Sequence, residues 1–335
     1  MVLRVGLLGV GMMGRHHARV LRETDGVELV AIADPGGDPH GVAGDLPVLP
    51  DVEALIDAGL DMAVVAVPTR FHEEAALALA AAGVHTLVEK PIADSLEAGQ
   101  RMVDAFRDAG LVGAVGHIER FNPALQELRR RLQAGELGAV YQIQTRRQGP
   151  FPSRIADVGV AKDLASHDVD LTAWVAQSEY ETVFAQTTFK SGREYEDMIA
   201  ITGRLTSGVI VNHLVNWLSP MKERVTVVTG EKGAFVADTS TGDLTFYANG
   251  TIPLEWESVT AFRGVSEGNI TRYAFPKREP LRVEHEAFRD AVLGRASDVV
   301  TMEQGQRTLT VVERALESAR RDVRAGLGSS GAGRA

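Results

Sequence analysis

Residues 2–34 read VLRVGLLGVGMMGRHHARVLRETDGVELVAIAD, and this stretch decides the fold of the first half of the chain. Residues 2–8 are a short apolar run rich in branched side chains, a helical segment follows at about 12–24, and 27–33 are apolar again. The two apolar runs do not alternate with polar residues, which is typical of strands that are covered on both faces. The pattern predicts a strand–helix–strand unit in a parallel sheet.

The turn after the first run is Gly9-Val10-Gly11-Met12-Met13-Gly14, which fits G-x-G-x-x-G, and Asp34 lies twenty residues beyond its last glycine. The first glycine allows a tight turn, the second lets the backbone approach a pyrophosphate, and the third lets the helix pack closely on the strand. Asp34 is placed to bind the ribose hydroxyls and to repel a 2′-phosphate, so the motif predicts NAD rather than NADP. Two alternatives stay open, a glycine-rich turn without a ligand and a turn role for Asp34 before Pro35.

Strands and helices continue to alternate up to about residue 118. Further strands are expected at 61–67, 84–88 and 111–116, and helices at 51–58, 70–82 and 95–109. The helix at 70–82 consists almost entirely of strong helix formers and stops at Gly83, a natural C-cap. These features predict a Rossmann domain over residues 1–120.

The second half, 121–325, has a different pattern and is expected to be a separate α/β domain, followed by a flexible tail at 326–335. Turn signals such as Ser207-Gly208 and Thr241-Gly242 separate its strand-like runs, as in an antiparallel meander. The expected strands are 140–147, 182–189, 197–205, 208–217, 224–229, 233–238 and 243–247, and the expected helices are 123–134, 161–176, 281–294 and 303–324.

Composition excludes several classes of function. A net charge of −10 over 335 residues argues against a nucleic-acid-binding surface. The absence of cysteine removes disulfides, thiolate nucleophiles and cysteine-bound metals, and suits a reducing compartment. Arg4 and the glycines after it break the signal-peptide pattern, and no stretch approaches the roughly 18 apolar residues of a membrane span. We expect a soluble, cytoplasmic protein without a nucleic-acid or membrane partner.

Two motifs lie at strand ends of the first domain. Glu89-Lys90-Pro91 ends the fourth strand, at the carboxyl edge where ligands of such sheets bind, so Lys90 can reach both cofactor and substrate. A solvated surface lysine is the alternative. Pro68-Thr69 ends the third strand, with His72 three residues further on. These residues either wrap the adenosine side of a cofactor or cap the next helix.

A third motif lies in the second domain, where Asp163 and His167 are four residues apart and Asp170 follows. On a helix these side chains share one face. A histidine is suited to take a hydroxyl proton at neutral pH, and an aspartate beside it can orient it or hold a sugar hydroxyl. The alternatives are a first-turn acid with a packed histidine and a metal site. No metal is expected, because hydride transfer to a nicotinamide needs none.

Taken together and in this order, the three motifs resemble the Gfo/Idh/MocA oxidoreductase family, over about residues 1–325. The resemblance implies a C-terminal open, mainly antiparallel sheet with helices on one side, whose bare face makes homodimers or homotetramers. It also implies roles. Lys90 would contact the nicotinamide ribose and the substrate oxygen, His167 would be the acid/base, and Asp163 would orient the substrate.

A narrower resemblance is to the subgroup similar to UDP-N-acetylglucosamine 3-dehydrogenases. It rests on VEKPIAD (88–94), GHIERFNPAL (116–125) and GPFPSRIADVGVAKDLASHDVD (149–170). The glycine-rich run that often precedes the family's acid is here Gly159-Val160-Ala161-Lys162, which makes a simple inositol dehydrogenase less expected.

A nucleotide-sugar substrate carries a diphosphate, which arginine is suited to hold. Of the four arginines near the junction, Arg154 is the first candidate and Arg120 the second, ahead of Arg146 and Arg147, and a solvated surface role is the alternative for each. His213 and Trp217 share one face of a strand and either line the pocket or pack in the sheet.

The resulting expectation is an NAD-dependent enzyme that oxidises a ring hydroxyl, at C3, of a nucleotide sugar such as UDP-N-acetylglucosamine. Three alternatives remain. They are a dehydrogenase of another sugar or a cyclitol such as inositol, an NAD-dependent glycosidase that oxidises C3 only transiently, and a non-catalytic NAD-binding regulator.

Overall fold

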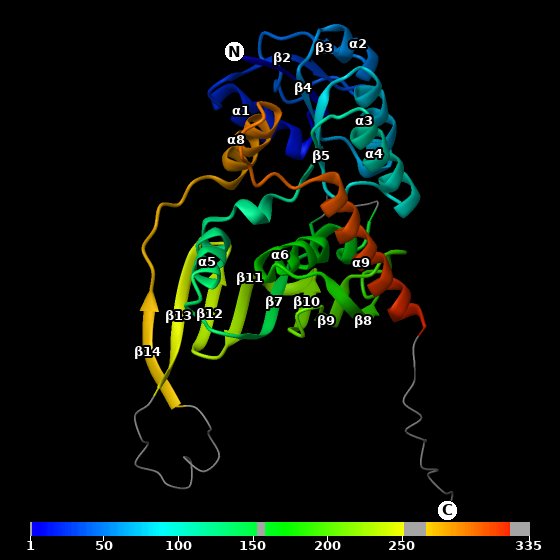
Figure 1. Ribbon diagram of the computed structural model, residues 1–335. Coiled ribbons are helices and arrows are strands. Elements are labelled where there is room, and N and C mark those ends of the chain that lie inside the picture. Colours follow the sequence, from blue (N-terminus) through cyan, green and yellow to red (C-terminus); the bar gives the residue numbers. More distant parts are fainter. Residues whose placement is uncertain (1, 153–157, 251–265, 322–335) are drawn as a thin grey trace, which may run out of the picture.

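The computed structural model describes residues 2–152, 158–250 and 266–321, and two sheets lie one above the other in it (Figure 1). The upper sheet has the order β3-β2-β1-β4-β5-β6, and all its neighbouring strands are parallel. This confirms the Rossmann sheet, to which the two-residue β3 adds an unpredicted edge. Its strands are β1 (Leu3–Leu8), β2 (Val27–Ala33), β3 (Val48–Leu49), β4 (Met62–Val65), β5 (His85–Glu89) and β6 (Gly113–Gly116).

Helices cover both faces of this sheet because its strands are apolar on both sides. Leu55, Leu79 and Met102 bury one face beneath α2, α3 and α4. Leu21 and Phe288 bury the other face beneath α1 and α8. The helices are α1 (Met12–Glu23), α2 (Val52–Asp57), α3 (His72–Ala81), α4 (Leu96–Asp108) and α8 (Pro280–Val292), with a short η1 (Thr69–Phe71) before α3.

Side-chain caps and one glycine set the helix ends. Asp51 and Ser95 accept hydrogen bonds from Ala54 and Ala98 at the starts of α2 and α4. Gly83 follows α3 with a φ of 75°, which confirms the predicted stop.

The lower sheet has the order β14-β13-β12-β11-β7-β10-β9-β8 and is mainly antiparallel, as expected. The predicted meander is wrong in one respect, because β7 lies between β11 and β10 and pairs with β10 in parallel. Strand β14 was missed because SEGNITR at 266–272 is polar and lacks an apolar face. The strands are β7 (Val140–Pro150), β8 (Tyr180–Thr188), β9 (Met198–Leu205), β10 (Ile210–Asn216), β11 (Leu218–Gly230), β12 (Gly233–Asp238), β13 (Asp243–Gly250) and β14 (Ser266–Arg272).

Helices cover one face of the lower sheet, and no helix in the described part of the chain covers the other, which we call the bare face (Figure 1). The covering elements are α5 (Pro123–Gln133), the π-turn η3 (Ala161–Ala165), α6 (Ser166–Ala176) and α9 (Met302–Arg320). Side chains that alternate with the buried ones point from the bare face, and the large apolar residues exposed on it include Phe184, Ile210 and Leu214.

The C-terminal part of the chain returns to the upper sheet. Helix α8 packs against α1 and against η2 (Ile118–Phe121), and the backbone N–H of Val115 in β6 donates to Val300. Residues 280–302 were expected in the second domain, but they pack on the first. No helix in the described part of the chain has the length and apolar character of a membrane span.

Candidate active site

The glycine-rich turn between β1 and α1 has the geometry of a phosphate cradle. A Cβ on Gly14 would lie 2.0 Å from the carbonyl oxygen of Gly9, so no larger residue fits there. A Cβ on Gly11 would meet nothing within 4 Å, and no described side chain caps the helix at this end. The first N–H groups of α1 therefore face open space, which suits the phosphates of a dinucleotide.

Asp34 lies at the end of β2 beside this turn. One carboxylate oxygen accepts from Val10 N at 2.9 Å and the other from Gly36 N at 2.8 Å. The bond from Gly36 N shows that Asp34 does have a role in the turn before Pro35, the alternative considered above. Each carboxylate oxygen still has a lone pair for a ribose hydroxyl. Of the two methionines in the motif, Met12 is exposed at the helix start and Met13 is half-buried.

Pro68 and Thr69 come directly after β4, but His72 points into the protein. Its ring nitrogens lie 3.0 Å from the carbonyl oxygen of Pro91 and 2.9 Å from that of Val67. Burial lowers the pKa of His72, and the ring is 1% exposed. The neutral ring carries one N–H and donates to one of these two carbonyl oxygens, and a direct contact with a cofactor would require it to leave this buried position. We therefore assign His72 to the support of the Lys90–Pro91 turn.

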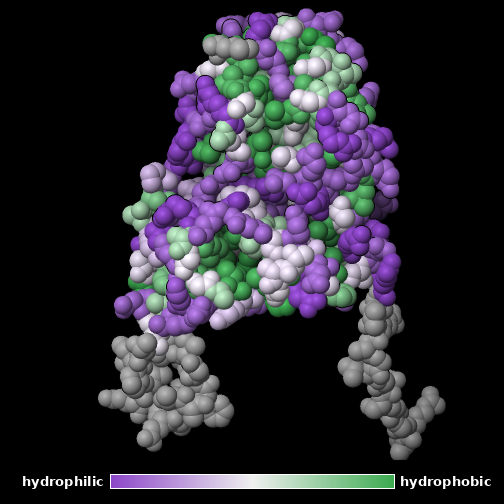
Figure 2. Space-filling view, viewed as in Figure 1, coloured by the Kyte–Doolittle hydropathy of each residue, from purple (hydrophilic) through white to green (hydrophobic). Residues whose placement is uncertain are grey.

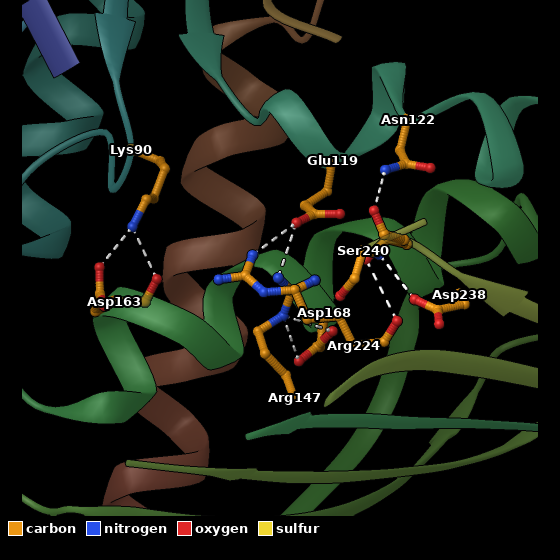
Figure 3. Close-up of polar contacts among 10 residues, drawn as sticks. Lys90, Glu119, Asn122, Arg147, Asp163, Asp168, Arg224, Asp238 and Ser240 are labelled. Atoms are coloured by element: carbon orange, nitrogen blue, oxygen red, sulfur yellow. Dashed lines mark hydrogen bonds and ion pairs between the residues drawn. The ribbon is translucent and has the colours of Figure 1, made fainter. Parts of the chain in front are cut away.

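Lys90 joins the two domains. It extends from the end of β5, and its Nζ donates to the backbone carbonyl of Asp163 at 2.8 Å and to its carboxylate at 2.9 Å (Figure 3). Asp163 lies on η3, one turn before His167, so the lysine of the first domain and the histidine of the second meet at one place. Figure 2 shows a band of hydrophilic residues across the molecule at this junction.

His167 is buried and has unused hydrogen-bonding capacity. It is 8% exposed, and its Nδ1 has no partner among the described residues. Burial, followed by the positive charges of Lys90 and Arg147, lowers its pKa well below the ordinary value. The imidazole is therefore neutral at physiological pH and can accept a proton.

The π-turn that carries Asp163 is held by Glu196. The carboxylate of Glu196 accepts from Ala161 N at 2.9 Å, and a Cβ on Gly159 would lie 2.0 Å from it. The segment 159–162 stands where the family often has a glycine-rich run. It keeps a glycine at position 159, where a side chain would collide with Glu196.

Asp170 and Arg120 belong to a buried ion pair. The guanidinium donates to both oxygens of Asp170 at 2.6 and 2.7 Å and to Gln304 at 2.8 Å, and Thr308 donates to the same carboxylate. Arg120 is thus occupied within the protein, and a substrate diphosphate would have to displace one of these contacts. Arg154 lies outside the described residues.

Sequence reasoning missed the network beside His167, which we call the Arg147 cluster: Glu119, Arg147, Asp168 and Arg224 (Figure 3). Arg147 donates to Asp168 at 3.1 Å and to Glu119 at 2.8 Å. Burial, helped by the negative charge of Glu119, outweighs the positive charge of Arg147 and raises the pKa of Asp168 to about 6. Arg147 keeps its charge, since the two carboxylates outweigh burial and raise its pKa.

Arg224 differs from Arg147 because it is not fully used. Among the described residues its side chain makes one hydrogen bond, a long one of 3.4 Å to Glu119, and the side chain is 32% exposed. Its charge acts on both His167 and Asp163. In sequence it lies in the charged run KER, which resembles a solvated turn, so no local signal marks it.

The remaining candidates pack within the second domain. His213 bonds to Thr145 and Tyr180 at 2.8 Å each, and Trp217 is 3% exposed in the apolar core. Arg146 pairs with Glu223 at the surface. Among the described residues no group of three or more His, Asp or Glu side chains is arranged to hold a metal ion.

Comparison with known proteins gives matches over both domains. The family model of the Gfo/Idh/MocA oxidoreductases with an NAD-binding Rossmann fold matches residues 3–117, and the model of a Gfo/Idh/MocA C-terminal domain matches 125–236. Inositol 2-dehydrogenase 1 of Saccharopolyspora erythraea is 30% identical over 307 residues, 87% of this chain and 86% of its own.

A second relative is the UDP-N-acetylglucosamine 3-dehydrogenase of Acidithiobacillus ferrooxidans. It is 33% identical over 213 residues, which are 63% of this chain and 66% of that enzyme, just under two thirds of its length. Its solved structure superposes with a TM-score of 0.82 and 26% identity, over 96% of this chain and 99% of that one.

Proposed function

Since the chain belongs to the Gfo/Idh/MocA family of oxidoreductases, we propose that it uses NAD to oxidise a ring hydroxyl of a sugar. The substrate we favour is a nucleotide sugar such as UDP-N-acetylglucosamine, oxidised at C3. The observation that carries the proposal is the Lys90–Asp163 contact across the two domains, one helical turn from His167.

The residues of the first domain fit NAD. The turn Gly9–Gly14 would hold the pyrophosphate at the open end of α1, and Asp34 would hold the ribose hydroxyls of the adenosine. The Glu89-Lys90-Pro91 segment would line the nicotinamide side, and Pro68 and Thr69, which follow β4, would contact the adenosine side. When bound, NAD accepts a hydride from the substrate carbon.

The residues at the junction would handle the proton and the charge. The neutral imidazole of His167 takes the hydroxyl proton, and the Lys90 ammonium stabilises the negative charge that develops on the substrate oxygen. Asp163 holds that ammonium in place at 2.9 Å, so the charge is oriented before the substrate arrives.

Arg224 supports an anionic substrate. A guanidinium that is one-third exposed, with a single long bond of 3.4 Å, has donors free for a phosphate or carboxylate. Arg154 keeps its predicted role as a diphosphate ligand, and the occupied Arg120 becomes the weaker candidate.

A cyclitol such as inositol is the second candidate, because the relative aligned over 86% of its length is an inositol 2-dehydrogenase. An uncharged cyclitol would have no group for Arg224. Replacing Arg224 by Met should therefore raise KM for a nucleotide sugar at least tenfold, about 1.4 kcal/mol, and leave KM for a cyclitol nearly unchanged.

The bare face of the lower sheet supports a homodimer or homotetramer. Its exposed apolar residues include Phe184 at 60% and Ile210 at 44%. Introducing a charge with Phe184→Glu should lower the mass measured by light scattering if this face joins subunits.

The test of the function is a screen of UDP-sugars and inositols. Each compound is added with NAD, its effect on the melting temperature is measured, and NADH is followed by its absorbance. A UDP-sugar should give both a stabilised protein and net NADH. Turnover of a glycoside without net NADH would identify the glycosidase alternative, and NAD binding without any turnover would identify a regulator.

A further inference from the structure

Three buried side chains form a chain of hydrogen bonds behind Lys90. His17 Nε2 lies 2.9 Å from a carboxylate oxygen of Glu89, and His17 Nδ1 lies 2.9 Å from His285 Nε2. His17 is 0% exposed, Glu89 is 8% exposed and His285 is 1% exposed. They come from α1, β5 and α8, so residues 268 positions apart in the sequence meet under the active site.

The hydrogens in this chain have one consistent direction. An ionised carboxylate only accepts, so His17 must donate from Nε2. If His17 is neutral, its Nδ1 accepts, and the donor is then Nε2–H of His285. This leaves a bare Nδ1 on His285, and that atom indeed has no partner among the described residues. The reverse arrangement would bury an unpaired N–H at the same atom, and orphaned buried N–H groups are rare.

The chain ends on the residue before Lys90. The second oxygen of Glu89 accepts from the backbone N–H of Lys90 at 3.1 Å. Gly116 on the neighbouring strand leaves room for this side chain, since a Cβ there would lie 3.3 Å from the Glu89 carboxyl carbon. Glu89 therefore connects the two histidines to the strand end that carries Lys90.

We propose that His17 and His285 are positioning residues for Lys90. His285 donates to His17, His17 donates to Glu89, and the carboxylate held in this way fixes the strand end from which Lys90 reaches Asp163. The effect on turnover rests on the proposed function, whereas the direction of the hydrogen bonds does not.

The charge of Glu89 depends on this chain. Burial acts to raise the pKa of Glu89. The hydrogen bond from His17, followed by the positive charge of Lys90 and the bond from its backbone N–H, acts against burial, and the pKa lies below its ordinary value. Without the relay the carboxyl group would take up a proton at higher pH, and its bond to the Lys90 backbone would weaken.

Burial disfavours the charged forms of the other titratable groups around Glu89. Burial, followed by the charge of Glu89, raises the pKa of Glu284 on α8 well above its ordinary value. Burial lowers the pKa values of His72 on α3, His117 before η2 and His285. Lys90 is thus the neighbour whose positive charge stabilises the ionised form of Glu89.

The first measurement is the protonation of the histidine nitrogens in the intact protein by ¹⁵N NMR. The His285 signals are identified by their loss in the His285→Gln variant. We expect a proton on Nε2 of both His17 and His285, with Nδ1 of His285 bare. A proton on His285 Nδ1, or a doubly protonated His17, would overturn the proposed direction. This measurement needs no substrate, so its result does not depend on the proposed function.

The second measurement compares two variants at one position. His285→Gln keeps an N–H donor, whereas His285→Leu removes it. We expect the Leu variant to move the acidic limb of the pH profile of kcat/KM upward by about one pH unit, and the Gln variant to stay within a few tenths. The limb moves upward because Glu89 then loses its charge at a higher pH.

The control is His16→Leu, on the exposed neighbouring position of α1. It should leave the profile unchanged, and NAD affinity should stay equal in all three variants. If the Leu and Gln variants lost activity alike and the profile did not move, the two histidines would serve only the packing of α8, and the positioning role would be refuted.

Discussion

The cradle of the first domain and the Arg147 cluster of the second are assembled in opposite ways. The cradle is made of neighbours in sequence, and its shape comes from backbone that a side chain would block, as the 2.0 Å approach at Gly14 shows. The cluster is made of side chains from distant segments, with Arg224 and Glu119 separated by 105 positions. The first kind of site is recorded in a local motif, and the second depends on the completed fold.

This contrast predicts that cofactor binding and chemistry can be separated by mutation. His167→Ala removes the proton acceptor and should lower kcat/KM by about 10²–10⁴-fold, or about 3–5 kcal/mol, with NADH affinity nearly intact. Steady-state kinetics and a fluorescence titration of NADH check both parts. Full turnover in this variant would contradict the assigned role, and His40→Ala, at an exposed position, is the control.

The next largest effect should fall on stability. Arg147→Met removes the bonded cation of the buried Asp168 and leaves Glu119 with only its long bond to Arg224, and the free energy of unfolding should drop by about 3–5 kcal/mol in denaturant melts. Arg146→Met, one position earlier, breaks an exposed pair with Glu223 and should cost less than about 1 kcal/mol. Equal losses in the two variants would mean that the cluster is not a buried network.

A third prediction concerns pH. Because burial raises the pKa of Asp168 to about 6, the native state holds a proton that the unfolded chain releases near pH 4. The stability from this proton is present at pH 4 and is lost as the pH rises through 6. The Asp168→Asn variant has no such proton to lose. Its free energy of unfolding should therefore rise relative to that of the parent by up to about 3 kcal/mol between pH 4 and 7. A relative loss over that range would contradict the raised pKa.

The smallest effect should lie in the cradle. Asp34→Asn keeps an acceptor for Val10 N but removes the charge that repels a 2′-phosphate. The ratio of NADP to NAD affinity should rise about tenfold, or about 1.4 kcal/mol, in paired titrations. An unchanged ratio would show that the discrimination against NADP lies elsewhere.

The same contrast explains how far the sequence could lead. Continuous apolar runs predicted five of the six strands of the parallel sheet to within two residues at each end, because these signals act within a few positions. The place of β7 between β11 and β10 could not be predicted, since it depends on pairing between strands far apart in the chain. Strand β14 offered no apolar alternation to detect.

For the site, the i, i+4 spacing predicted that Asp163 and His167 share one face, and the family resemblance implied that Lys90 acts with them. Lys90 contacts Asp163, one turn before His167. The arginines were harder to predict. A guanidinium that is bonded inside the protein and one that is partly exposed look alike in sequence. Arg120 is bonded to Asp170, whereas Arg224, which we propose for an anionic substrate, carries no local signal.

The central claim is that Lys90 and His167, from different domains, act on one substrate as a unit. It is tested most directly by NADH formation in Lys90→Met, His167→Ala and the double variant, with the substrate found in the screen. Groups that act as a unit are strongly non-additive, so the double variant should be about as slow as the slower single variant. Losses that simply multiply would show that the two residues act independently, and would contradict the shared site.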